Sequence, residues 1–371
     1  MARTMSLPGA RPAMDATDLD GNRAVAIWLW SVAALVFAMI VVGGATRLTG
    51  SGLSITEWKP ILGAIPPLNE TDWLTAFEKY KQIPQYALVN AGMTLGDFKF
   101  IYAWEWSHRL LGRLVGFAFA LPFLAFWLTG RLRDGQPVKL LSVLALGGLQ
   151  GAIGWYMVSS GLAERVDVSQ YRLALHLTVA FVLLGTLVWF ALGEGSQRRP
   201  AVSRAVPAAT RTFAAVIVAL VLVQVVLGAF VAGLKAGLVY NTWPDMNGQF
   251  VPSDYWLEHR GVLSVFESHA AAQFNHRISA YLVGLAALFQ LWLVTRAQSS
   301  DGVIRSAYVL TAAVFVQILI GIATLLGHVP LHLGLLHQAG GALVLIAAVW
   351  HLFTCAVDTS ASRRPPSQQA R

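Results

Sequence analysis

The sequence predicts an all-α integral membrane protein whose eight transmembrane helices form two parallel, pseudo-symmetric four-helix bundles. Three observations predict this class: few charged residues, eight long apolar runs, and two halves in which polar residues recur in the same order. Of the 371 residues, 56% are hydrophobic and 12% are charged, about half of the charged share usual in soluble domains. Mean hydropathy is +0.58. These values exclude a water-soluble protein built around a single core.

Eight apolar runs are long enough to cross a bilayer, which takes roughly 20 residues of α-helix. The second and sixth runs begin with polar residues, among them Glu105, His108 and His276, and polar groups at such places need an internal role. The runs lie at about 24–45, 103–129, 138–158, 170–192, 210–232, 272–295, 304–326 and 332–356.

Basic residues cluster after the second, fourth, sixth and eighth runs. Because positively charged connections stay in the cytoplasm, both termini are expected there, and the long connections 46–102 and 233–271 are expected on the outer side. The first 23 residues lack the apolar core of a cleaved signal, so a bacterial inner membrane is the expected location. The basic clusters are Arg131, Arg133 and Lys139; Arg198, Arg199 and Arg204; Arg296 and Arg305; and Arg363, Arg364 and Arg371.

The net charge of +8 is spread over these short clusters and forms no single patch, so membrane topology accounts for it and no nucleic acid partner is expected. The single cysteine, Cys355, excludes an intramolecular disulfide, an iron–sulfur cluster and a cysteine-based zinc site. Any metal must be held by other ligands.

The two halves repeat each other. Residues 104–109 and 272–277 both place an aromatic residue two positions before a histidine and an arginine directly after it. Further on, Gln150 and Gln317 are each followed four residues later by a glycine. We therefore expect a cytoplasmic tail at 1–23, an N-terminal four-helix half at 24–200, a C-terminal half at 201–356 and a second tail at 357–371. Because four is even, the halves run parallel about an axis along the membrane normal.

Four histidines fall at the beginnings of the even-numbered runs: His108, His176, His276 and His337. These helices all run from outside to inside, so the four lie near the outer, periplasmic face. A single membrane histidine often makes only an interhelical hydrogen bond, but ionisable groups at matched depths are usually functional. Two histidines on different helices of a bundle can bind a haem iron from opposite sides. The repeat then implies two haem sites, one in each half.

Two arginines, Arg109 and Arg277, directly follow histidines. Guanidinium groups there match haem propionates, although long basic side chains also extend to lipid headgroups. Arg113 has no basic counterpart, since Tyr281 holds that place in the second half, and a cation so deep needs a propionate or a carboxylate as partner.

Acidic residues distinguish the halves. Glu57 and Glu105 of the first half correspond to Thr242 and Gln273 in the second. A carboxylate near a reacting haem edge accepts protons or stabilises a cationic intermediate; the alternative for Glu57 is a solvated loop acid. For Glu105 we favour a partner of Arg109 or a group that orients His108.

These residues resemble the haem A synthase family. The resemblance rests on the run Gly43–Ser54, the motif Glu105–Arg113, Asn275-His276-Arg277, and the histidines His176 and His337. It covers roughly residues 24–356. The chain lacks the cysteine pair that one branch carries in the first outer loop, so it resembles the alphaproteobacterial and mitochondrial branch.

The resemblance implies oxidation of the C8 methyl of haem O to a formyl group, giving haem A, with water as the oxygen source and with electrons passing to an acceptor not yet identified. It implies a haem b cofactor held by His276 and His337, with Arg277 beside it. It implies a substrate haem held by His108 and His176 with Arg109 and Arg113, and a catalytic part for Glu57. The other expected partners are haem O synthase, by direct contact, the lipid bilayer, and further copies of the chain in a homo-oligomer.

Two other functions fit the same pattern. A bis-histidine dihaem electron-transfer protein or quinol oxidoreductase needs the same four histidines, but it predicts two equivalent haems, and the one-sided acids argue against that. A transporter is suggested by the repeat and the intramembrane charge, but paired histidines at one level and unbroken helices argue against it.

Overall fold

The structure, a computed structural model, describes residues 16–163, 165–195 and 206–362. Within these ranges the regular secondary structure is all helical apart from one isolated bridge between Met246 and Gln249. Eight helices are long and apolar enough to cross a membrane, which confirms the predicted class. They are α1 (Ala16–Leu48), α4 (Leu95–Leu128), α5 (Gln136–Ser159), α6 (Gln170–Gly195), α7 (Ala208–Gly233), α9 (His269–Arg296), α10 (Asp301–Leu326) and α11 (Leu331–Ser362).

The predicted tails and the boundary between the halves fall partly outside the described residues. Residues 1–15, 196–205 and 363–371 are not described, so the predicted boundary at 200/201 and the basic clusters at 198–204 and 363–371 lie outside the description. Residues 16–23, expected in the N-terminal tail, belong to α1, and residues 357–362, expected in the C-terminal tail, belong to α11.

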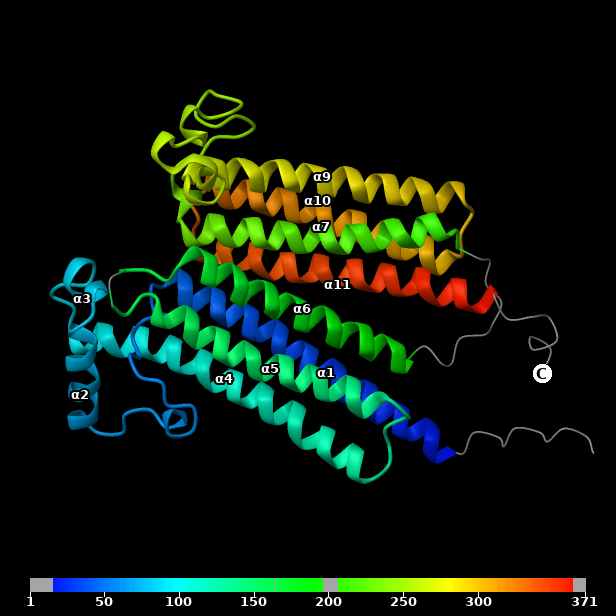
Figure 1. Cartoon of the computed structure of the whole chain (residues 1–371), viewed down its shortest axis with the longest axis horizontal. Helices are drawn as coiled ribbons and strands as arrows, with labels where there is room; N and C mark the ends of the chain where they lie inside the picture. Colours follow the sequence, from blue (N-terminus) through cyan, green and yellow to red (C-terminus); the bar gives the residue numbers. More distant parts are fainter. Residues whose placement is uncertain (1–15, 164, 196–205, 363–371) are drawn as a thin grey trace, which may run out of the picture.

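The long helices pack in two groups of four, visible one above the other in Figure 1. In the first group α1 contacts α4 and α6, and α5 closes the ring between them. In the second, α7 contacts α9 and α11, and α10 closes the ring. The groups meet where α6 contacts α7 and α11, and where α1 contacts α11. Matched in chain order, both groups have the same contact pattern; the pseudo-symmetric arrangement itself stays a prediction.

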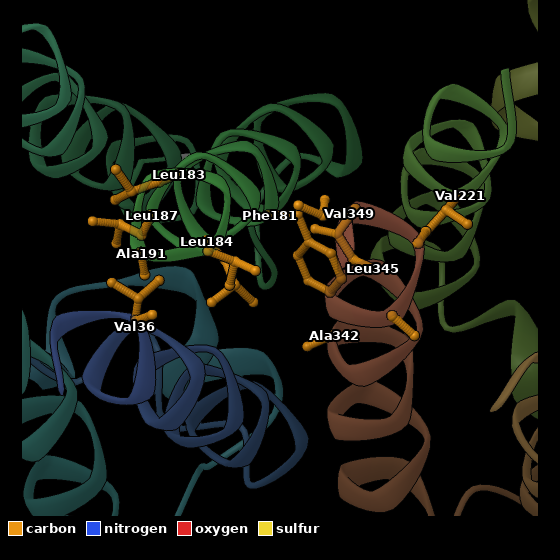
Figure 2. Close-up of a cluster of buried hydrophobic side chains, with 14 of the residues drawn as sticks. Val36, Phe181, Leu183, Leu184, Leu187, Ala191, Val221, Ala342, Leu345 and Val349 are labelled. Carbon is orange, nitrogen blue, oxygen red and sulfur yellow. The ribbon is translucent and has the colours of Figure 1, made fainter. Parts of the chain in front are cut away.

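The centre of the molecule is an apolar core shared by both groups. Figure 2 shows Val36 of α1, Leu184 of α6 and Leu345 of α11 converging there. Leu184 and Leu345 are completely buried. In a bilayer this contact is held by close packing, because lipid chains are as apolar as leucine.

Both long connections lie at the same end of the bundle. The beginning of α1 and the end of α11 lie at the opposite end (Figure 1). The first connection holds two helices that the hydropathy pattern did not predict, α2 (Glu70–Lys81) and α3 (Pro84–Leu88). Its aromatic residues Phe77 and Tyr80 pack on Phe98 of α4, with ring centroids 4.9 and 5.4 Å away. The second connection holds short helical turns and α8 (Ser264–Glu267).

Three helices begin earlier than predicted because polar side chains cap them. Ser268 accepts a hydrogen bond from the backbone of Ala271 at the start of α9, and Ser300 does the same for Val303 in α10. The start of α4 is a capping box, in which the Thr94 and Asp97 side chains each accept a hydrogen bond from the other's backbone N–H. Caps of this kind are local and polar, so an apolar-run criterion misses them.

We expect Thr94→Ala to loosen the first turn of α4. Loss of an N-cap costs about 1 kcal/mol, so amide exchange at residues 95–98 rises roughly fivefold in a hydrogen-exchange measurement. Thr75→Ala is the control, because the Thr75 hydroxyl bonds only to the Thr71 carbonyl inside α2. Equal exchange at 95–98 in the two variants would show that the cap does not hold α4 in place.

Candidate functional site

The four predicted histidines come together in two pairs, one in each group of helices. In the second group the rings of His276 (α9) and His337 (α11) have centroids 6.2 Å apart and planes at 83°. In the first group His108 (α4) and His176 (α6) lie on two helices that both contact α1 and α5. Three of the four lie about two turns after the start of their helices, at the end that carries the long connections.

Each histidine ring lies against a glycine of a neighbouring helix. A Cβ atom built on any of these glycines would lie 2.8–3.0 Å from the Cε1 atom of the ring. Real Cβ atoms almost never come closer than 3.0 Å, as they would at Gly43, Gly154 and Gly321, and the 3.0 Å contact at Gly228 is tighter than nine in ten real ones. A side chain at any of these places therefore requires the imidazole to shift. The absence of a side chain is therefore what places each ring. The pairs are Gly43 (α1) with His108, Gly154 (α5) with His176, Gly228 (α7) with His276, and Gly321 (α10) with His337.

In the second group, two glutamines hold the histidines, each one turn before the glycine on the same helix. The amide nitrogen of Gln224 lies 3.1 Å from Nδ1 of His276 and donates to the backbone carbonyl of that residue at 3.0 Å. The amide nitrogen of Gln317 lies 3.0 Å from Nδ1 of His337 and donates to its carbonyl at 2.6 Å. Both rings are thus tied to the backbone of their own helix through one amide.

The first group holds its histidines less firmly. Gln150 donates to the backbone carbonyl of His176 at 2.8 Å. The buried Nδ1 atoms of His108 and His176 have no hydrogen-bond partner within the described part of the chain. The rings of the two groups therefore sit in similar cradles, but only those of the second group are oriented by a polar neighbour.

The arginines that follow the histidines fasten the outer connections to the helices. Arg109 donates to the carbonyls of Ile55 and Glu57 at 2.8 and 3.0 Å. It also forms an ion pair with the buried Glu105 at 2.7 Å, as the sequence led us to favour. The other carboxylate oxygen of Glu105 accepts hydrogen bonds from the hydroxyl of Ser54 and the backbone N–H of Ile55. Glu105 is therefore a structural anchor of the first connection.

Arg277 makes the corresponding contacts in the second group. It donates to the carbonyls of Tyr240 and Asp245 at 3.0 and 2.9 Å and to the Oε1 atom of Gln273 at 2.8 Å. Gln273, in the place of Glu105, donates in turn to the carbonyl of Ala236. The neutral amide thus fills the anchoring role without a charge.

Arg113 finds backbone partners where a carboxylate or a propionate was expected. It donates to the carbonyls of Pro60 and Lys59 at 2.7 and 2.9 Å. Its buried Nη1 atom, like the Nε atom of Arg277, has no partner among the described residues. Each group therefore keeps one buried guanidinium N–H for an acceptor such as a carboxylate.

Glu57 lies in the first connection and is half-exposed. Its carboxylate contacts Lys79 of α2 at 2.9 Å and Lys59 at 3.1 Å. Hydrogen bonds from these two lysines, Lys79 first, lower the pKa of the Glu57 carboxyl below its ordinary value. Its backbone carbonyl accepts from Arg109, the neighbour of His108, which ties this acid to the α4 side of the first histidine pair.

The donor set fits a haem better than a bare metal ion. No group of three or more His, Cys, Asp or Glu side chains within the described ranges is arranged to hold a metal. Two imidazoles with centroids 6.2 Å apart leave room for one metal between them, since a metal–imidazole bond is about 2 Å. A macrocycle that brings its own ring of nitrogen ligands needs only such an axial pair. The glycine cradles and the free guanidinium N–H groups fit a flat ring with carboxylate substituents.

Sequence reasoning singled out the four histidines, the three arginines Arg109, Arg113 and Arg277, and two of the three glutamines. It missed Gln224 and the meaning of the glycines. The signal was present: a glutamine four residues before a glycine occurs at 150/154, 224/228 and 317/321, and four residues is one helical turn.

We expect Gly228→Ala to weaken haem binding by the second group. The added methyl overlaps the His276 ring, and such overpacking costs roughly 1–3 kcal/mol, about five-fold to a hundred-fold in affinity. Haem retained per chain after gel filtration, measured as the pyridine haemochrome, should fall. Gly116→Ala is the matched control, because a Cβ there meets nothing within 4 Å. A Gly228→Ala protein that retains haem as well as this control would show that the cradle does not position the ring.

Comparison with known proteins identifies the family of this chain. Residues 26–349 match the family model COX15-CtaA, described as cytochrome oxidase assembly protein. The chain is 51% identical over 330 residues to the heme A synthase of Brucella ovis, covering 89% of this chain and 91% of that protein. It is 48% identical over 344 residues to the heme A synthase of Parvibaculum lavamentivorans, covering 92% and 96%. With its eight helices and paired histidines, the chain belongs to the COX15-CtaA family.

Proposed function

We propose that this protein is a haem A synthase, an enzyme of haem biosynthesis that oxidises the C8 methyl of haem O to a formyl group. The observation that carries the proposal is the pair of buried, glycine-cradled histidines in each group of helices, in a chain about half identical to heme A synthases over nearly its whole length. Two axial pairs hold two haems, one as cofactor and one as substrate.

In the C-terminal half, 201–356, His276 and His337 would hold haem b, and the unpartnered Nε–H of Arg277 would be available to a haem propionate. The support is the glutamine amides, which lie 3.1 and 3.0 Å from the Nδ1 atoms of His276 and His337 and restrict the orientation of both rings, as a permanent cofactor requires. The N-terminal half, 24–200, holds the substrate haem through His108 and His176, whose Nδ1 atoms lack partners in the described structure. Arg109 and Arg113 lie on this side, and the Nη1 atom of Arg113 is free to bind a propionate.

Conversion of a methyl to a formyl group takes one oxygen atom from water and releases four protons and four electrons. A haem b held by His276 and His337 would supply the redox centre through which these electrons leave for an external acceptor. The protein binds the two haems, orients the substrate ring and excludes bulk water from it.

Glu57 acts on the substrate half through its charge. A carboxylate whose pKa is lowered is a weak proton acceptor, but it stays ionised over a wide pH range and stabilises positive charge that develops nearby. The lysine contacts and the tie of its carbonyl to Arg109 support this electrostatic role over that of a general base.

The enzyme lies in a bacterial inner membrane, with both termini cytoplasmic and both haem sites near the periplasmic face. The basic clusters between helices and the position of both long connections at one end (Figure 1) support this orientation. Haem O reaches the first half by contact with haem O synthase within the bilayer, and no nucleic acid takes part. A dihaem electron carrier or quinol oxidoreductase is not favoured, because the relatives are heme A synthases.

The experiment that tests this function is to express the protein with and without a supply of haem O and to analyse the extracted haems by chromatography. We expect haem b alone without the supply, and haem O followed by haem A when it is restored. His337→Ala should lose haem b, and His176→Ala should lose haem O while keeping haem b. Two haem b per chain, unchanged by the supply, would overturn the proposal in favour of an electron carrier.

We expect Lys79→Met to change the pH dependence of the rate of haem A formation, so that the fall in rate on the acid side occurs at higher pH. The Lys79 hydrogen bond is the largest cause of the lowered pKa of Glu57, so its loss lets that pKa rise. A carboxyl with a lowered pKa loses its charge, and the stability that the charge contributes, only when the pH falls through that low value; in the variant the loss comes at higher pH.

The matched control for this profile is Lys81→Met. Lys81 lies on the same helix but pairs with Glu78, at 2.6 Å. If the acid-side fall in rate moves equally in both variants, or in neither, the Glu57 charge does not contribute to the reaction.

A further inference from the structure

We propose that His108 is the axial ligand that dissociates from the substrate haem, and that Met39 is the residue that leaves it free to do so. This rests on the proposed function, since it concerns how the first group of helices holds its haem. The argument compares four equivalent places, three of which carry a polar clamp and one of which does not.

The clamp is a glutamine one turn before the glycine that cradles the ring. It is present for His176, His276 and His337, as Gln150, Gln224 and Gln317, and each amide donates to the backbone carbonyl of its histidine at 2.6–3.0 Å. For His108 the equivalent position lies four residues before Gly43, and the residue there is Met39.

Methionine cannot replace this clamp. Its thioether has no hydrogen to donate and is a weak acceptor. The Met39 side chain lies along α4 one turn beyond His108, because a Cβ built on Gly112 would lie 3.2 Å from the Met39 Cε atom. It is thus similar in size to a glutamine and next to His108, but it contributes no polar group. Nδ1 of His108 is buried without a partner in the described structure.

The missing amide matters for metal binding. An imidazole that binds a metal through Nε2 carries its proton on Nδ1, and that proton needs an acceptor. The Oε1 atoms of Gln150, Gln224 and Gln317 have no partner within the described ranges. The amides of Gln224 and Gln317 lie 3.1 and 3.0 Å from the Nδ1 atoms of their histidines, and the amide of Gln150 is bound to the backbone carbonyl of His176, whose Nδ1 atom is itself unpartnered in the described structure. Each of these three histidines therefore has a side chain already bound to it that carries an unpartnered acceptor oxygen. His108 has none, and loss of such a partner typically weakens a metal site 10-fold to 100-fold.

The consequence is a directed opening of the substrate site. When His108 dissociates, His176 keeps the haem in place and one axial position opens on the α4 side. That side carries Glu105 one turn before His108, and Arg109, which binds the carbonyl of Glu57. The ligand that opens the site is thus the one whose helix is tied, through Arg109, to both acids that distinguish the first half from the second.

The test is binding of carbon monoxide to the reduced protein, because carbon monoxide binds a haem iron only at an open axial position. We expect the wild type to bind it at the first-half haem, and Met39→Gln to lower that affinity about tenfold or more. Met39→Leu, equally apolar, is the control and should behave as the wild type. His108→Ala and His276→Ala supply the reference spectra of an open first-half and an open second-half site.

The reverse variant, Gln224→Met, removes the clamp from His276. This variant should make the haem b of the second half bind carbon monoxide. The measurement tests the inference even if the Met39→Gln protein cannot be obtained in folded form. Affinity unchanged by both Met39→Gln and Gln224→Met would overturn the inference. Carbon monoxide binding needs no turnover, so it tests the inference separately from the proposed function. The inference can be overturned in a protein that still forms haem A, and it can be supported in a protein that forms none.

Discussion

The contact between an imidazole ring and a bare glycine backbone on the neighbouring helix is the constraint on which the site depends. It occurs four times, with a built Cβ only 2.8–3.0 Å from the ring. In a membrane, helices associate by close packing more than by the hydrophobic effect, so a missing side chain is the most direct way to make room. Placing the rings in this way requires that α1, α5, α7 and α10 each approach a histidine-bearing helix at one depth, which the two rings of helix contacts provide.

The outer connections are built around the same helices. Arg109 and Arg277, next to the histidines, donate to carbonyls of the two connections, so the positions of the connections and of the histidines are coupled through one turn of helix. Glu105 and Gln273 support these arginines with the same geometry, although one is charged and the other is neutral. Anchoring by itself therefore does not require the charge of Glu105. The half that carries this charge is the one to which we assign the chemistry.

Differences between the halves are confined to a few polar groups. The second half orients both rings with amides, while the first leaves both Nδ1 atoms without partners in the described structure. Because a buried polar atom without a partner costs free energy, such atoms persist where a ligand supplies the missing contact or where movement is needed. The unpartnered N–H groups of Arg113 and Arg277 fit the same description and are ready for a carboxylate.

The amino-acid sequence by itself determined the eight spans, the four histidines and the repeat of motifs, because hydropathy and spacing along one helix are local properties. It also indicated that Glu105 pairs with Arg109, since residues four apart share a helix face. The tertiary structure decided which glycine faces which ring, that Gln224 belongs with Gln150 and Gln317, and that Glu57 is held by Lys79 of α2, a helix whose apolar content is too low to stand out. These contacts join residues on different segments of the fold, 16 or more positions apart along the chain. They depend on how two helices approach each other, which no pattern along a single helix encodes.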